Sequence, residues 1–317
     1  MRLWDDEIDS MREEARALVE SGMAALAAQL HRGGAPADPL ERVAVQRAER
    51  RATYAPVADA IDRELGGVRC RTFTPDGPPR AVYLHFHGGG MILGDPEMMD
   101  VGNRALARRH RLAVVSVDYR KAPEHPFPAG PDDGVAVAEW LLEHAAAEYG
   151  TDRLLIGGES AGGYMTAAVM LRIRDELDAI DRVAGANLVF GVFDWGRSPS
   201  QRGVRPSSVP DLLDPDGVVF FCDCYLPGRS DEERRDPAVS PAYADLAGLP
   251  SARFSVGTAD HLLDDTLIMA SRYAAAGNDT ELFVAPDMPH GFMAFPCGIT
   301  ERWAAGTDAW FAARLAR

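Results

Sequence analysis

The sequence predicts an α/β fold, in which helices flank a mostly parallel central sheet. From about residue 69 to the C-terminus, short apolar runs of strand length alternate with longer runs of helical character. Such alternation is typical of parallel sheets with helices on both faces. In addition, two glycine-rich segments directly follow predicted strands. We expect these two loops to lie in one active site, because the loops at the carboxyl ends of parallel strands meet at one edge.

The individual elements follow from the apolar runs and the helical patterns between them. The predicted strands are 69–73, 82–86, 112–118, 154–157, 186–193, 253–257 and 282–285. The predicted helices are 97–110, 132–149, 161–177, 262–275 and 301–315. Two segments fall outside this alternation. Residues 4–30 are amphipathic and helical, with a second helix at about 40–51, and 196–235 is a proline-containing insertion.

The pentapeptide 158–162, Gly-Glu-Ser-Ala-Gly, joins a predicted strand to a predicted helix. In a nucleophile elbow the chain turns sharply at this point, and the flanking glycines avoid a steric clash. Ser160 would then present its hydroxyl at a helix N-terminus, which favours developing negative charge. The alternative is a glycine-rich turn of an unrelated α/β protein.

The second glycine segment is 87–90, His-Gly-Gly-Gly, after the predicted strand 82–86. Backbone N–H groups in such a loop can approach a ligand without obstruction by side chains. Ester hydrolysis needs donors of this kind for the oxyanion of its tetrahedral intermediate. A phosphate-binding loop is disfavoured, because no Gly-Lys-Ser/Thr or Gly-x-Gly-x-x-Gly pattern is present.

A nucleophilic serine also needs a base, and only two histidines follow Ser160 in the sequence. His290 follows the predicted strand 282–285 and lies on a loop at its carboxyl end. His261 directly adjoins Asp260 and opens a predicted helix. Neighbouring residues on one loop seldom form a base–acid hydrogen bond with each other, so we expect His290 to be the base.

The acid that orients the base has several candidates. Asp260 ends the predicted strand 253–257 and its short loop, which is the position expected for this role. Asp264 and Asp265 fall in the following helix, where capping or exposure to solvent is expected instead. Asp287 lies only three residues before His290 on the same loop. We therefore expect Asp260 to be the acid.

The chain resembles the hormone-sensitive-lipase-like family of α/β-hydrolase esterases, in its small bacterial form. The most specific block is 118–129, Asp-Tyr-Arg-Lys-Ala-Pro-Glu-His-Pro-Phe-Pro-Ala. The other blocks, in the order and spacing of the family, are 87–90, 158–163, 240–241, 249–250, 257–260 and 290–292. The resemblance extends from about Tyr83 to the C-terminus and implies an α/β-hydrolase fold.

The resemblance also implies roles for individual residues. Ser160 corresponds to the nucleophile, His290 to the base and Asp260 to its acid. The donors of the oxyanion hole correspond to residues in the set Gly88, Gly89, Gly90 and Ala161. Two positions depart from the family, which usually has Asp or Thr at Glu159 and Pro at His261. Glu159 is expected to alter hydrogen bonding at the elbow, and His261 either to loosen the acid loop or to raise the local charge at low pH.

In the family, an N-terminal helical segment and an insertion cover the site. The resemblance thus implies a helical cap made of residues 1–55 and 196–235, over a catalytic domain of 56–195 and 236–317. The alternative is that both segments pack on the body as plain structure. An ester pocket needs an apolar wall, so Met91, Ile92, Phe220 and Phe221 are candidate acyl-pocket residues. We also expect Arg120 and Glu124 to form a buried ion pair beneath the site.

Composition narrows the function further. The net charge of −15 argues against nucleic acid and anionic membranes as partners. No apolar run approaches the roughly 20 residues of a membrane helix, and the N-terminus does not resemble a signal peptide. Four scattered cysteines fit a cytoplasmic location, and Cys222-x-Cys224 is a weak metal pattern. We expect no metal and no cofactor.

These observations predict a cytoplasmic serine carboxylesterase for short-to-medium acyl esters, acting through an acyl-enzyme intermediate. Its expected partner is a small-molecule ester, and a homodimer is left open. A lactonase or an arylformamidase-like amidase remains an alternative on the same triad. A further alternative is a non-catalytic small-molecule receptor of the same fold, which the presence of His290 disfavours.

Overall fold

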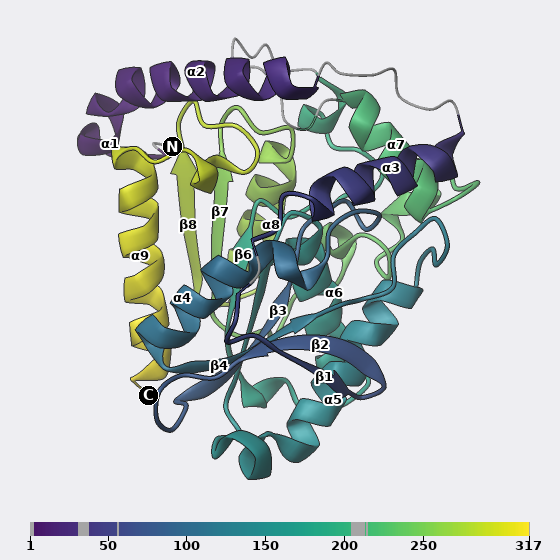
Figure 1. Ribbon diagram of the computed structural model, residues 1–317, viewed down its shortest axis with the longest axis vertical. Helices are drawn as coiled ribbons and strands as arrows, with labels where there is room; N and C mark the ends of the chain where they lie inside the picture. Colours follow the sequence, from purple (N-terminus) through teal and green to yellow (C-terminus); the bar gives the residue numbers. More distant parts are fainter. Residues whose placement is uncertain (1–2, 31–37, 56, 204–212, 214, 317) are drawn as a thin grey trace.

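The structure is a computed structural model that describes residues 3–30, 38–55, 57–203, 213 and 215–316. Within these ranges, an eight-stranded sheet has the order β1-β2-β4-β3-β5-β6-β7-β8 (Figure 1). The pairs from β4 through β8 are parallel, whereas β2 is antiparallel to both β1 and β4. The predicted α/β class with a mostly parallel sheet is therefore confirmed.

The strands match most of the predicted runs. Their bounds are β1 Ile61–Leu65, β2 Val68–Phe73, β3 Ala81–Phe86, β4 Leu112–Val117, β5 Leu154–Glu159, β6 Val183–Val189, β7 Ala252–Gly257 and β8 Thr280–Ala285. β1 was not predicted, because it is a largely exposed edge strand rich in charged residues. The strand predicted at 186–193 was placed too late. Its chain leaves the sheet at Phe190, which has a φ of 37°.

Helices cover both faces of the sheet. α4 (Asp100–His110) and α9 (Gly298–Leu315) lie on one face, and α5 (Ala129–Tyr149), α6 (Ala161–Asp175) and α8 (Leu263–Ala275) lie on the other. Short 3-10 turns are Pro96–Met99, Ile180–Arg182, Ser200–Arg202, Glu233–Arg235, Pro241–Tyr243 and Phe292–Ala294. The largest core fills the α5, α6 and α8 side, with β3 and β4 buried along their whole length.

Four further helices gather at one end of the molecule (Figure 1). They are α1 (Asp6–Ser10), α2 (Arg12–Leu30), α3 (Pro39–Arg51) and α7 (Pro215–Tyr225). α2 is tied to the loop after β8, where Arg12 and Arg16 form ion pairs with Asp287 at 2.8 and 2.9 Å. These helices therefore lie at the carboxyl end of the parallel strands. Part of the predicted insertion, 204–212 and 214, lies outside the described residues.

The predicted ion pair between Arg120 and Glu124 is wrong. Arg120 pairs instead with Asp133 of α5 at 2.8 Å, and its side chain is half exposed. Asp133 also accepts a hydrogen bond from the backbone N–H of Arg120 at 2.7 Å, which fixes this choice of partner. Glu124 pairs with Arg47 of α3 at 2.7 Å. The ion pair of Glu124 with Arg47 therefore joins α3 to the 118–129 segment rather than lying beneath the site.

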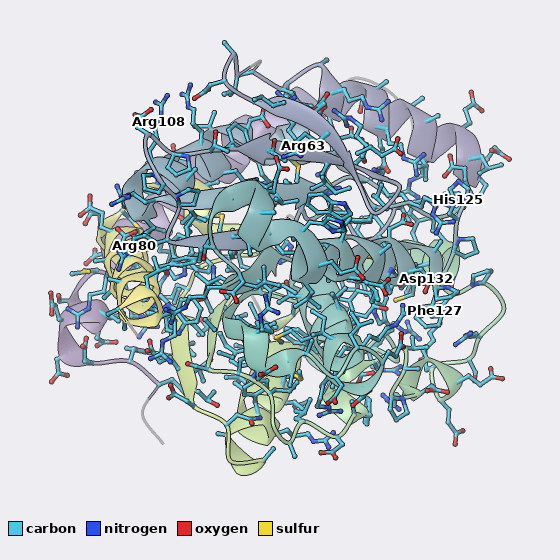
Figure 2. All side chains as sticks on the ribbon, turned by 90° about the horizontal axis from the view of Figure 1, so that it is seen from below. Arg63, Arg80, Arg108, His125, Phe127 and Asp132 are labelled. Carbon is cyan, nitrogen blue, oxygen red and sulfur yellow. The ribbon has the colours of Figure 1, made fainter. Side chains whose placement is uncertain are left out.

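Many basic side chains on the surface form ion pairs with acidic side chains. Figure 2 shows Arg63, Arg80 and Arg108 at separate places on one side of the molecule. Arg63 forms an ion pair with Glu148 at 2.7 Å, and Arg108 forms one with Asp59 at 2.9 Å. Such a surface does not favour polyanion binding. No helix in the described part of the chain is both long and apolar enough to cross a membrane.

Candidate active site

Ser160 lies at the turn between β5 and α6 in a strained backbone conformation. Its φ of 57° and ψ of −119° fall in a region that few side-chain-bearing residues adopt. Its N–H donates to the carbonyl of Val189 at 2.9 Å, which holds the turn against β6. A Cβ at either Gly158 or Gly162 would collide with the carbonyl oxygen of Phe86. The glycines flanking Ser160 therefore let β3 pass directly beneath the elbow.

Three side chains from separate loops form a hydrogen-bonded relay. The Oγ of Ser160 lies 3.0 Å from Nε2 of His290, and Nδ1 of His290 lies 2.9 Å from Oδ2 of Asp260. Asp260 is fully buried, and its other oxygen accepts from the N–H of Leu262 at 2.8 Å. The carboxylate thus favours the tautomer with a proton on Nδ1, which leaves Nε2 free to accept the Ser160 proton.

The other acidic candidates make different contacts. Asp287 is occupied by Arg12 and Arg16, which hold the pKa of its carboxyl below the usual value against the effect of burial. Asp265 accepts four hydrogen bonds from the 193–201 segment. Asp264 accepts from the N–H of Ser200 at 2.8 Å. The structure brings only Asp260 of these four into contact with His290.

The glycine loop lies against the elbow. A Cβ on Gly88 would come within 3.0 Å of the carbonyl oxygen of Glu159 and within 3.3 Å of Cβ of Ser160. Gly89 and Gly90 have φ values of 128° and 63°, which favour glycine. Within the described residues, no group accepts a hydrogen bond from the N–H of Gly89, Gly90 or Ala161. These N–H groups are therefore available to a ligand at Ser160.

His87, the first residue of the 87–90 segment, holds the glycine loop in place through buried contacts. Its ring stacks on Tyr119 with centroids 4.4 Å apart, and its Nδ1 lies 2.8 Å from the carbonyl oxygen of Gly88. The side chain is fully buried, and burial lowers the pKa of His87 to about 3. His87 is therefore a neutral structural support at physiological pH.

A small apolar cavity of about 30 Å³ opens beside Ser160. Apart from Ser160 itself, its walls are Gly90, Val192, Trp195, Leu213, Val218, Phe221, Cys222 and Leu262. Phe221, a predicted pocket residue, is among them. Val218 and Cys222 share its face of α7 at helical spacing, a signal that the sequence contained. Trp195 and Leu262 were not predicted: Trp195 lies on a loop with no periodic pattern, and Leu262 immediately precedes α8.

The structure does not place Met91, Ile92 or Phe220 in this cavity, so these three pocket predictions need correction. Met91 has a φ of 64° and is fully buried, with its Cε close to Gly130. Ile92 is also fully buried. Phe220 lies on another side of α7, where the Arg42 guanidinium is 4.3 Å from its ring centroid.

Both departures from the family pattern make defined contacts. Oε2 of Glu159 lies 3.1 Å from Nε2 of His85, whose Nδ1 lies 2.8 Å from the hydroxyl of Ser116. Glu159 therefore joins the elbow to β3 and β4. The Nδ1 of His261 lies 2.7 Å from the carbonyl oxygen of Ser200. This contact ties the acid loop to its surroundings, contrary to the expectation that His261 would loosen it.

The cysteine pattern at 222–224 has no metal-binding geometry. Sγ of Cys222 lies 3.7 Å from the carbonyl oxygen of Trp195, and burial raises the pKa of this thiol to about 12. In the described ranges, no cluster of three or more His, Cys, Asp or Glu side chains has an arrangement that could hold a metal ion.

Comparison with protein families matches residues 83–294 to the α/β-hydrolase fold. The chain belongs to the α/β-hydrolase family. This α/β-hydrolase is 39% identical over 224 residues to the carboxylesterase NlhH of Mycobacterium tuberculosis, covering 68% of this chain and 67% of that protein. It is 34% identical over 247 residues to the esterase LipI of the same organism, covering 74% of each.

A solved structure of a hormone-sensitive lipase from a metagenome library superposes on this α/β-hydrolase with a TM-score of 0.80. The two are 32% identical, and the match covers 96% of this chain and 98% of that one. The predicted membership of the hormone-sensitive-lipase-like esterases is thereby confirmed. The α/β-hydrolase is accordingly a carboxylic ester hydrolase, as the sequence predicted.

Proposed function

We propose that this enzyme is a serine carboxylesterase with Ser160 as nucleophile, His290 as general base and Asp260 as the acid that orients the base. The relay of two hydrogen bonds, at 3.0 and 2.9 Å, carries this proposal. Such a chain activates a serine whose hydroxyl is otherwise a weak nucleophile. The presence of the base in full contact also favours an enzyme over a receptor of the same fold.

The reaction proceeds in two halves. The Oγ of Ser160 attacks the ester carbonyl while Nε2 of His290 takes the hydroxyl proton, and the imidazolium then protonates the departing alcohol. Water then attacks the acyl-enzyme carbonyl while Nε2 takes its proton, and the imidazolium returns that proton to Oγ of Ser160 as the acid is released. In both halves the N–H groups of Gly89, Gly90 and Ala161 stabilise the oxyanion, with Gly88 shaping the loop. Each such donor typically lowers the barrier by about 3 kcal/mol.

The substrate range follows from the cavity. Its volume of about 30 Å³ holds about two or three non-hydrogen atoms, since one water needs at least ~10–15 Å³ on this scale. We place the optimum near four acyl carbons, at the short end of the predicted short-to-medium range. Longer chains need a wider cavity, to whose wall Phe221 of α7 contributes.

We propose further that 1–55 and 196–235 form a cap over the catalytic body of 56–195 and 236–317. Two contacts support this division. The α7 residues Val218, Phe221 and Cys222 contribute cavity wall beside Ser160. At the other side, Arg12 and Arg16 of α2 bind Asp287 on the loop that carries His290.

A panel of p-nitrophenyl esters from acetate to palmitate, run beside anilides and lactones, tests this proposal. We expect kcat/KM to peak at butyrate, with no activation at an oil–water interface and far slower turnover of anilides and lactones. A preference for palmitate would refute the short-chain assignment. Faster turnover of lactones or anilides than of any ester would replace the carboxylesterase by the alternative activities.

A further inference from the structure

The loop that carries Asp260 is joined to the start of the proposed cap by a reciprocal contact. Nδ1 of His261 donates to the carbonyl oxygen of Ser200 at 2.7 Å, and the Ser200 hydroxyl donates back to the carbonyl oxygen of His261 at 2.8 Å. His261 is 5% exposed and Ser200 is 3% exposed. Both hydrogen bonds are thus shielded from water, which increases the cost of breaking them.

The same serine continues onto α8. The N–H of Ser200 donates to the carboxylate of Asp264 at 2.8 Å, and its hydroxyl oxygen accepts from the N–H of Asp264 at 3.1 Å. The N–H, hydroxyl and carbonyl of Ser200 therefore each bond to the segment from His261 to Asp264, and the carbonyl also accepts from the N–H of Gly203 at 3.1 Å. One residue of the cap segment is fixed by two residues that closely follow the acid of the relay.

Asp265, in the first turn of α8, also binds the segment that contains Ser200. One of its oxygens accepts from the N–H groups of Phe193 and Asp194, both at 2.8 Å. The other accepts from the Ser198 hydroxyl at 2.6 Å and from the Gln201 amide at 2.7 Å. The carboxylate is fully buried. The chain from 193 to 201 is thereby folded around the beginning of α8.

These hydrogen bonds join the segments 193–201 and 261–265, and residues in or next to both segments line the cavity beside Ser160. Val192 and Trp195 flank the two residues whose N–H groups donate to Asp265. Leu262 directly follows His261. Leu262 also donates its N–H to Asp260. A shift of these two joined segments would therefore move the acyl-cavity wall and Asp260 together.

We propose that His261 is a positioning residue that locks the acyl-cavity wall onto the catalytic acid loop and so limits acyl length. This inference rests on the proposed function of the Ser160 site. A proline, which the family usually has at this position, offers no side-chain donor to the Ser200 carbonyl. The side chain of His261 therefore gives this chain a link between cap segment and acid loop that a proline cannot form.

The test compares kcat/KM for butyrate and octanoate p-nitrophenyl esters, each per active site titrated with an organophosphonate. We expect His261→Ala to lower kcat/KM for butyrate roughly five- to tenfold, the effect of one buried hydrogen bond. Because the wall is released, the octanoate-to-butyrate ratio should rise at least about threefold. His261→Asn places an amide N–H where Nδ1 lies and should restore the wild-type ratio.

His110→Ala is the matched control, since His110 is also a buried histidine with a ring hydrogen bond, to Asp308 at 2.9 Å, but it joins α4 to α9. It should lose stability without changing the ratio. Ser200→Ala serves if His261→Ala fails to fold, because it removes the other half of the reciprocal contact, the hydroxyl that donates to the His261 carbonyl, and it should shift the ratio in the same direction by a smaller factor. An unchanged ratio in His261→Ala or Ser200→Ala, no rescue by asparagine, or an equal shift in His110→Ala would overturn the inference. A wild-type protein that turns over no ester would refute the proposed function instead.

Discussion

Gly90 shows how closely the oxyanion loop is fitted to the site. Its φ is 63°, and a Cβ there would lie 2.6 Å from the ring of Phe221. Gly67, in the β1–β2 turn, also has a positive φ of 79°, but a Cβ there meets nothing within 4 Å. The two glycines thus share a left-handed backbone conformation and differ in their surroundings.

We expect Gly90→Ala to lower kcat/KM roughly 10²-fold, because the displaced loop misdirects an oxyanion donor. Gly67→Ala should cost only ~1–2 kcal/mol of stability, from the left-handed backbone, and leave kinetics unchanged. Steady-state kinetics per titrated site and denaturant melts measure both. Similar kinetic constants for the two variants would count against the assigned role of the loop.

At the residue level, the sequence predicted features that depend on neighbouring residues along the chain, but not those that depend on tertiary packing. Ser160, Asp260 and His290 lie one, three and five residues after the ends of β5, β7 and β8, so the positions of the strand ends were enough to predict that they meet. The partner of Arg120 was wrongly predicted, because Glu124 is near in sequence whereas Asp133 is near in space. Partner choice among many acids is decided by tertiary packing, which no spacing rule contains.

At the element level, α7 separates two adjacent aromatic residues by function. Phe221 contacts the cavity beside Ser160, and Phe220 lies under the Arg42 guanidinium. The sequence marked both, because the helical phase of the insertion was not predicted. Met91 and Ile92, which follow the glycine loop and were also predicted as pocket residues, are instead buried in the core.

Phe221→Ala and Phe220→Ala form a matched pair on this helix. Removing the Phe221 ring enlarges the cavity, so we expect the acyl optimum to move from butyrate toward octanoate. Each additional methylene that is buried adds about 0.8 kcal/mol, up to a fourfold gain in kcat/KM. Phe220→Ala should keep the wild-type profile. An identical shift in both variants, measured across the ester series, would indicate general loosening of α7 instead.

For the whole molecule, the buried His87 makes stability depend on pH. Burial lowers the pKa of His87 to about 3 in the folded state, against about 6.5 in an unfolded chain. Between these values the unfolded state binds more protons, so the free energy of unfolding falls as pH falls. The contribution is complete above about pH 6.5, and its loss reaches roughly 2 kcal/mol at pH 5.

His87→Asn keeps a side-chain donor for the Gly88 carbonyl but cannot titrate. We expect the variant to lose roughly 2 kcal/mol less than the wild type between about pH 7.5 and pH 5. The variant must be compared with the wild type, because burial also raises the pKa of Asp265 to about 7, and this shift increases the free energy of unfolding as pH falls over the same range. Urea melts of both proteins at the two pH values measure the change in the free energy of unfolding. Parallel losses in the two proteins would contradict a neutral buried His87.

The central claim is that Ser160 is the nucleophile of an acyl-enzyme reaction, and covalent labelling tests it most directly. The intact protein is treated with a p-nitrophenyl phosphonate, and the site of attachment is mapped by peptide mass spectrometry, with Ser160→Ala as the control. We predict one phosphonyl group per chain, on Ser160, with loss of ester hydrolysis in step with labelling and no labelling of the alanine variant. Attachment at another residue, or ester turnover by Ser160→Ala at the wild-type rate, would contradict the account.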